Sequence, residues 1–334
     1  MSSEMADQPR VLGALASARH RLHGQLTPLV MQKPAGTVLI ARGSSDHAAV
    51  YGRYLIEAAT KRPVALAAPS LQTHYGIQTD YSNYLVVAIS QSGQTPEVVT
   101  LASTAAASGA VTVAITNHPQ SELAAACDVT IDLKAGQEWA VPATKTFTAE
   151  LAALAILTES AGLSIPERAW LRLPQLVQSI LEDPTPARHA AALVGGADRM
   201  FSVARGFTYC IALEAALKIK ETTSVLAEGY SVADLRHGPI AAIDKGVPLI
   251  AFKARGPTDR DIDLLLKDVR LKGATAILCA PEDVAELPLP GSVAEPLMPI
   301  LAAVRAQQVA YHLSLDRGLD PDSPEGLSKV TMTR

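Results

Sequence analysis

Short apolar runs alternate with helix-length segments along most of the chain, and this alternation limits its fold more than any other feature. In the first half the apolar runs lie at 37–45, 64–68, 85–90 and 111–116, and the helical segments lie at 47–60, 96–108 and 144–161. Parallel strands need a crossover of helix length between them, so this order predicts a parallel sheet with helices on both faces.

The same theme restarts in the second half. There the apolar runs lie at 200–206, 247–254 and 274–280, and the helical segments lie at 208–223, 258–272 and 297–317. The tripeptide Ala-Arg-Gly ends the first run of each half, at 41–43 and 204–206, which hints weakly at duplication. We predict an α/β fold with two similar doubly wound parallel sheets, each a flavodoxin-like α/β/α sandwich with its ligand site outside the carboxyl ends of the strands.

A length of 334 residues suits two domains of ordinary size. Residues 10–30 have apolar side chains at near-helical spacing, and residues 182–188 have the proline and charge content of a connection. The predicted segments are an N-terminal helical segment (1–34), a first α/β domain (35–180), a second α/β domain (195–318) and a C-terminal active-site tail (319–334).

Composition and charge exclude several classes of protein. Hydrophobic residues make up 48% and charged residues 19%, so the chain can bury a large core. The net charge of −4, with both signs scattered, argues against a nucleic-acid binder. Cys127, Cys210 and Cys279 lie far apart, which argues against a disulfide scaffold and a structural zinc site. The sequence has no stretch of about 18 apolar residues and no signal-peptide core, so we expect a cytoplasmic protein without a membrane partner.

Two serine-rich turns follow predicted strands. The first is Gly43-Ser44-Ser45, and the second, at 90–95 with the sequence SQSGQT, precedes a helix that begins at Pro96. Hydroxyl groups, a glycine and the N–H groups of a helix N-terminus together suit a phosphate dianion. Either turn alone is better explained as an ordinary helix cap, but two such turns at matching strand ends favour a phosphate site.

A charged stripe lies on the predicted helix at 208–223. Glu214, Lys218 and Glu221 are spaced i, i+4 and i+7, so they share one face, and their neighbours are Ala, Leu and Ile. A solvated salt-bridge ladder would explain the spacing, but the apolar neighbours favour a cleft, where shifted pKa values suit carboxylates and lysines to proton transfer. His237, in a turn set by Gly238 and Pro239, is an acid/base candidate.

Several separated motifs resemble one known family. They are GSS before a helix, SQSGQT, VPATKTFTAEL, ALEAALKIKE, AEGYSVADLRHGP and PEGLSKVT. From about residue 35 to the C-terminus the chain resembles the isomerase part of glucosamine-6-phosphate synthase, a tandem pair of sugar isomerase (SIS) domains. No glutaminase domain and no cysteine precede Cys127, so glutamine hydrolysis is not expected. The resemblance is better to stand-alone tandem-SIS proteins, which include glucosamine-6-phosphate deaminases and fructosyl amino acid phosphate deglycases.

The resemblance implies a substrate site in which the serine turns hold the sugar phosphate, a valine backs the substrate and a carboxylate lies near the sugar. The matching residues are Ser44, Ser45, Ser90, Gln91, Ser92, Thr95, Val141 and Glu138.

The resemblance also implies four catalytic residues. Glu221 matches the base that moves a proton between C1 and C2, and Lys218 matches a lysine near the sugar O1 and amine. His237 matches the histidine that assists ring opening and enters from the neighbouring subunit of a homodimer. Lys329 matches a C-terminal lysine that can form a Schiff base with the open-chain ketose.

The activity implied is conversion of glucosamine 6-phosphate and water to fructose 6-phosphate and ammonia, with no metal and no organic cofactor. One alternative is a deglycase or isomerase that acts on another phosphosugar, such as a fructosyl amino acid 6-phosphate, because it would use the same residues. Another is a non-catalytic phosphosugar sensor. Such regulators usually carry a helix-turn-helix segment, and about 35 residues before the first strand are too few for one.

Overall fold

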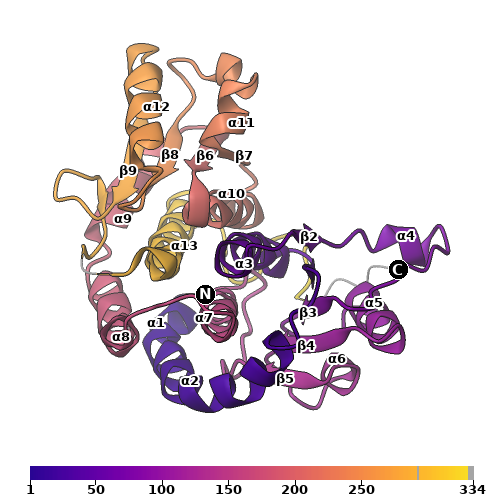
Figure 1. Ribbon diagram of the computed structural model, residues 1–334. Coiled ribbons are helices and arrows are strands. Elements are labelled where there is room, and N and C mark those ends of the chain that lie inside the picture. The colour runs from indigo at the N-terminus through magenta and orange to yellow at the C-terminus, as the bar shows by residue number, and fades with distance from the viewer. Residues whose placement is uncertain (292, 330–334) are drawn as a thin grey trace. The chain divides into compact units, whose positions relative to one another are not determined.

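The computed structural model describes residues 1–291 and 293–329. These residues group into two compact units, which we call the N-sheet unit and the C-sheet unit (Figure 1). The N-sheet unit comprises Arg10–Glu138 and Lys145–Pro166, and the C-sheet unit comprises Met1–Pro9, Trp139–Thr144 and Glu167–Lys329.

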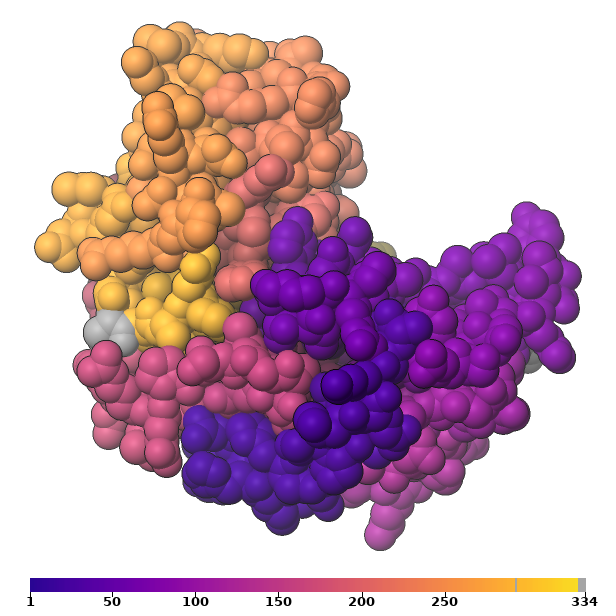
Figure 2. All heavy atoms as spheres, in the orientation of Figure 1, coloured from indigo at the N-terminus to yellow at the C-terminus, as the bar shows by residue number. Residues whose placement is uncertain are grey.

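The N-sheet has five parallel strands in the order β2-β1-β3-β4-β5. The strands are β1 (Thr37–Ile40), β2 (Val64–Leu66), β3 (Leu85–Ile89), β4 (Val111–Thr116) and β5 (Val129–Asp132). The helices of this part of the chain are α2 (Gln8–Val30), α3 (Ser44–Thr60), α4 (Ser70–Thr73), α5 (Pro96–Ala107), α6 (Glu122–Ala125) and α7 (Lys145–Ser160). The α4 segment, which exposes Leu71 and Tyr75, protrudes at the edge of this unit (Figure 2).

The C-sheet also has five parallel strands, in the order β10-β9-β8-β6-β7. The strands are β6 (Arg199–Ala204), β7 (Leu226–Ser231), β8 (Leu249–Phe252), β9 (Ala276–Ala280) and β10 (Leu287–Pro288). The helices are α1 (Ser2–Ala6), α8 (Glu167–Glu182), α9 (Thr185–Val194), α10 (Tyr209–Thr223), α11 (Val232–Arg236), α12 (Asp259–Leu271) and α13 (Met298–Asp316), with 3-10 turns at Gly206–Thr208, Pro239–Ala242 and Glu295–Leu297.

When the strands of each sheet are numbered in chain order, both sheets have the spatial order 2-1-3-4-5. Helices cover both faces of each sheet (Figure 1). The prediction of two doubly wound parallel sheets is confirmed. The two Ala-Arg-Gly tripeptides occupy equivalent places after β1 and β6, and their glycines, Gly43 and Gly206, have φ values of 60° and 64°. These left-handed conformations suit glycine, which has no Cβ to clash with the backbone.

Alternate strand residues fill the layer between each sheet and its helices. In the N-sheet unit, Val38, Ile40 and Val86 pack against Val98 and Leu101 of α5. The corresponding layer of the C-sheet unit packs side chains of β6 and β8 against the apolar face of α12. Burial of each such side chain contributes about 1.5–3 kcal/mol, so these layers fix the strand ends from which the candidate site is built.

The segment at 182–188 is not the connection that the sequence suggests. Only Asp183 and Pro184 separate α8 from α9, because Pro186 lies in the first turn of α9, where a proline breaks no helical hydrogen bond. The boundaries of the four predicted segments stay a prediction. Of the predicted tail at 319–334, residues 330–334 lie outside the described residues.

Within the described ranges, no helix combines the length and the apolar character needed to cross a bilayer. The three cysteines are free, with Cys210 and Cys279 buried and Cys127 half-buried. Burial raises the pKa of the Cys127 thiol to about 11 and that of Cys279 to about 12, so both thiols are protonated near neutral pH.

Candidate functional site

The two serine turns lie side by side at the carboxyl edge of the N-sheet. They follow β1 and β3, which are hydrogen-bonded neighbours with Ile40 paired to Ala88. The chain leaves β1 toward β2 on one side and reaches β3 on the other, so the turns flank the point where the strand order reverses. Open α/β sheets bind ligands at such a point.

Hydrogen bonds within the turn at 90–95 fix its conformation. The Ser90 and Thr95 hydroxyl oxygens are 3.1 Å apart, and the Gly93 N–H donates to Ser90 Oγ at 3.2 Å. Gly93 has a φ of 62°, and a Cβ there would lie 2.0 Å from Ser121 Oγ. The Thr95 side chain makes no cap bond to α5, so an anion can use the first-turn N–H groups.

The Ser45 hydroxyl points into the protein rather than toward an open turn. Its Oγ donates to Glu150 Oε1 of α7 at 2.8 Å, and both side chains are buried. An O–H bond from Ser45 to a phosphate therefore requires that hydrogen to leave Glu150. Ser44, the first residue of α3, is half-buried and lies beside Gly43, whose backbone carries no side-chain cap.

Arg42 joins the two turns, and the sequence analysis did not identify it as a site residue. Its Nε lies 2.8 Å from Glu97 Oε2, in the first turn of α5, and the Glu97 side chain is only 6% exposed. The guanidinium neutralises a carboxylate that would otherwise repel a phosphate at the start of α5. The sequence could have indicated Arg42 as a site residue, because it lies between a buried strand and the glycine that opens the first serine turn.

On α10 the charged stripe buries Glu214 and Lys218 and leaves Glu221 partly exposed, in line with its apolar neighbours in the sequence. Lys218 is 0% exposed, its Nζ lies 3.4 Å from Glu214 Oε1, and it also donates to Glu221 Oε2. Burial disfavours its charge, but the Glu214 and Glu221 carboxylates outweigh that effect and raise the pKa of Lys218. Lys218 is therefore a fixed positive charge beside Glu221 at neutral pH.

His237 lies far from this cluster along the sheet. It ends α11, past the carboxyl end of β7, whereas Glu221 lies two residues before α10 ends and β7 begins. Six strand residues, about 20 Å, separate these two ends of β7. His237 is exposed, and among the described residues nothing bonds its imidazole.

A second set of contacts in the C-sheet unit gathers around Trp139–Thr144. Lys329 Nζ donates to the Ala140 carbonyl at 2.7 Å, and the Val141 N–H donates to the Asp322 carbonyl at 2.9 Å. Glu4 of α1, only 5% exposed, accepts from the Ala140 N–H at 3.0 Å and from the Trp139 N–H. The sequence analysis did not find Glu4, because 135 residues separate it from Trp139.

Helix α13 connects these contacts to α10. Thr222 Oγ1, next to Glu221, lies 3.4 Å from the Ala310 carbonyl, and one turn earlier Gln307 Nε2 donates to the Thr144 carbonyl at 3.2 Å. The helix with Lys218 and Glu221 and the segment with Val141 therefore pack against the same part of α13. Glu138, by contrast, is a buried member of the N-sheet unit, where its Oε1 accepts from the Thr146 N–H at 3.3 Å.

The structure thus divides the predicted site residues into three groups. One edge of the N-sheet carries the turn residues Ser44, Ser45, Ser90, Gln91, Ser92 and Thr95. In the C-sheet unit, Lys218 and Glu221 form an ion pair, and Lys329 bonds to Ala140 beside Val141. The described part of the chain has no cluster of His, Cys, Asp and Glu suited to a metal ion.

Comparisons with known proteins agree with this architecture. The SIS domain family matches residues 32–160 and 195–283. The chain is 34% identical over 298 residues to a glutamine--fructose-6-phosphate aminotransferase (isomerizing) of Methanothermobacter thermautotrophicus, covering 87% of this chain and 50% of the relative. The chain spans about half the length of the first curated relatives that it matches.

Two solved structures have the same fold over nearly the whole chain. A proposed phosphosugar isomerase of Silicibacter pomeroyi has a TM-score of 0.85 at 30% identity, covering 96% of this chain and 99% of that one. A glucosamine-6-phosphate deaminase of Thermotoga maritima has a TM-score of 0.80 at 22% identity, covering 99% of each chain.

Proposed function

This chain belongs to the SIS domain family, and we propose that it is a glucosamine-6-phosphate deaminase that converts its substrate and water to fructose 6-phosphate and ammonia. The observation that carries the proposal is the ion pair on α10 between the buried Lys218 and the partly exposed Glu221. A carboxylate positioned in this way can act as a general base that accepts a proton from carbon. The Thermotoga maritima glucosamine-6-phosphate deaminase has the same fold over 99% of this chain.

Substrate binding uses the N-sheet turns in this proposal. The phosphate lies at the start of α5, within reach of the Ser90, Ser92 and Thr95 hydroxyls and the first-turn N–H groups. Gln91 and Ser44 complete the cradle, and Arg42 keeps Glu97 from repelling the dianion. Val141 and Glu138 lie nearer the sugar.

The reaction begins with ring opening. The partner subunit's His237 protonates the ring oxygen, which breaks the bond to C1 and exposes the C1 aldehyde. Glu221 then removes the C2 proton and returns it at C1, and a second proton passes from the C2 ammonium to O1, so that the C2–N bond becomes an iminium and C1 becomes an alcohol. Lys218 stabilises the negative charge that develops on O1.

Two routes then release ammonia. Water can add to the C2 iminium and expel ammonia, leaving the ketone of fructose 6-phosphate. Alternatively the Lys329 amine, once deprotonated, adds to C2 and expels ammonia, and water then hydrolyses that Schiff base and frees the lysine. Both routes consume one water and yield one ammonia.

The test is release of ammonia and fructose 6-phosphate from glucosamine 6-phosphate without glutamine. Equal amounts of both products, absent with Glu221→Gln, support the proposal. If neither product forms but a fructosyl amino acid 6-phosphate is cleaved, the protein is a deglycase. If no phosphosugar is converted while one still binds, it is a sensor.

A further inference from the structure

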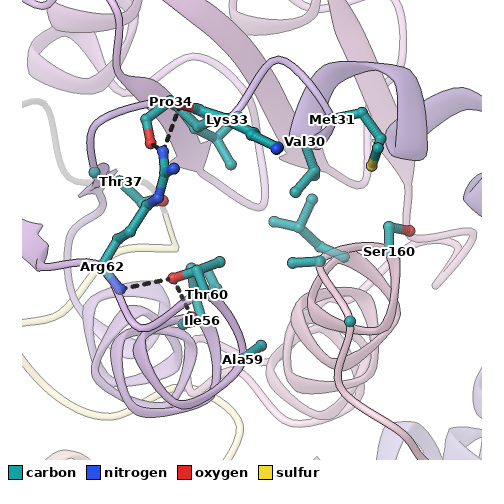
Figure 3. A pocket seen from close by; sticks show the side chains of 15 residues that line it. Val30, Met31, Lys33, Pro34, Thr37, Ile56, Ala59, Thr60, Arg62 and Ser160 are labelled. Carbon is teal, nitrogen blue, oxygen red and sulfur yellow. Dashed lines mark hydrogen bonds between the residues drawn. The ribbon is translucent and has the colours of Figure 1, made fainter.

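A pocket opens at the amino ends of β1 and β3, at the edge of the N-sheet opposite to the serine turns (Figure 3). Its volume is about 420 Å³, within the range of small-molecule sites, which is roughly 300–1,000 Å³. The C-terminal end of α3 forms one wall, with Ile56 and Ala59, and the C-terminal end of α7 forms the facing wall, with Leu157 and Ser160.

The walls are mostly apolar and the charges have one sign. Apolar lining residues come from the end of α2, from the two walls and from the start of β3; they are Val30, Met31, Pro34, Ile56, Ala59, Leu85, Leu157 and Ala161. Lys33 and Arg62 are the charged lining residues, and the lining contains no carboxylate. A pocket lined by one sign of charge favours a ligand of the opposite sign.

The rim that carries Lys33 is held rigidly. Lys33 has a φ of 55°, a left-handed conformation that is strained for a residue with a side chain. Arg62 Nη1 holds this conformation because it donates to the carbonyls of both Lys33 and Pro34 (Figure 3). The Lys33 N–H donates to the Val30 carbonyl at 3.0 Å, and the Ala35 N–H donates to the Asn83 carbonyl at 2.8 Å.

Within residues 1–291 and 293–329, no carboxylate pairs with the Lys33 ammonium. The Arg62 guanidinium lies at the same rim, since it bonds the Lys33 carbonyl. An anionic group at this rim would be attracted by both positive charges, and because the rim is already ordered, binding would cost little further ordering. The apolar walls offer few partners for the hydroxyls of a sugar phosphate, because a polar group without a hydrogen bond is costly to bury.

We propose that this pocket binds a small organic anion with an apolar body, such as a medium-chain carboxylate. The carboxylate lies at Lys33 and Arg62, and the apolar body lies between α3 and α7. This binding site is separate from the serine turns and does not rest on the proposed deaminase activity.

The first test measures octanoate binding to the full chain by isothermal titration calorimetry, with n-octylamine as a probe of equal length and opposite charge. We expect octanoate to bind at least about tenfold more tightly than octylamine, since two charges change from attraction to repulsion. Equal affinities, or no octanoate binding at millimolar concentration, would overturn the proposal.

Variants then locate the site. Lys33→Met should weaken octanoate binding about threefold to fivefold, the scale of a partly exposed ion pair. Lys61→Met is the matched control, because Lys61 is also exposed and left-handed, with a φ of 57°, but does not line the pocket. An equal loss in both variants would contradict a contact at Lys33.

Filling the pocket tests its apolar part. Ala59→Phe should abolish octanoate binding, because the ring would occupy the space between the two helices. Ala161→Phe, on the facing side, serves the same purpose if Ala59→Phe does not fold, as judged by circular dichroism. Unchanged octanoate binding in a folded filling variant would place the anion elsewhere and overturn the proposal.

Discussion

Glu221 precedes the amino end of β7 and His237 follows its carboxyl end, and the six-residue strand between these two ends is about 20 Å long. We propose that a homodimer shares its sites, with His237 of one subunit completing the Glu221 cluster of the other. We therefore predict that inactive His237→Ala and inactive Glu221→Gln proteins regain up to about a quarter of wild-type activity when their subunits exchange, the share of intact sites in random mixing. Activity assays after verified exchange measure this, and the absence of recovery would place both groups in one subunit's site or remove one of them from catalysis.

The ion pair on α10 should be needed for stability as well as for activity. Lys218→Met removes the positive charge beside the buried Glu214 carboxylate and beside Glu221, and we expect the free energy of unfolding to fall by about 3–5 kcal/mol. Glu214→Gln combined with Lys218→Met should recover much of that loss but not the activity. Urea denaturation measures the first effect, and equal stability of Lys218→Met and the wild type would contradict the contact.

The same pair predicts a pH dependence. The two carboxylates raise the folded-state pKa of Lys218 above 10.5, so the pair stabilises the fold fully below pH 10.5 and its contribution is lost as pH rises through the folded pKa. Urea midpoints of the wild type and of the double variant should therefore converge above pH 10.5. A difference that grows as pH rises toward 10.5 and is constant above it would mean that the pKa of Lys218 is lowered instead.

Glu4 should act on the site only through the backbone that it holds. Glu4→Ala leaves the Trp139 and Ala140 N–H groups without their acceptor, which should lower the free energy of unfolding by about 1–3 kcal/mol. It should also reduce borohydride trapping of a Lys329 adduct with fructose 6-phosphate, because Ala140 holds the lysine. Glu4→Gln keeps an acceptor oxygen and should restore trapping; equal loss in both variants would show that the charge, not the positioning, matters.

The turn at 90–95 should control affinity for the phosphate. Ser90→Ala with Thr95→Ala removes two hydroxyls and should raise KM for the phosphosugar at least about tenfold, with a small change in kcat. The control is Ser17→Ala with Ser179→Ala, since those hydroxyls only bond carbonyls of their own helices. If KM stays unchanged in the first double variant, the turn is structural.

Elements with a local pattern of apolar residues could be predicted from the sequence. Contacts between residues far apart in the sequence could not. The strands and helices around both serine turns were predicted, because apolar runs and helix periodicity are local signals. Strand β7 was missed, since LAEGYS mixes polar residues and glycine at a sheet edge. The Arg42–Glu97 pair and the Ser45–Glu150 bond join residues 55 and 105 positions apart, and only the packed sheet brings them together.

The most direct measurement of the central claim follows the C2 hydrogen. With glucosamine 6-phosphate deuterated at C2, Glu221 should carry part of the label to C1 of fructose 6-phosphate, in competition with exchange into water, and Glu221→Gln should form no labelled product. Mass spectrometry and proton NMR of the product measure this. Deuterium at C1 that depends on Glu221 agrees with one base acting at both carbons, whereas retention of all the label at C1 in Glu221→Gln would contradict that role.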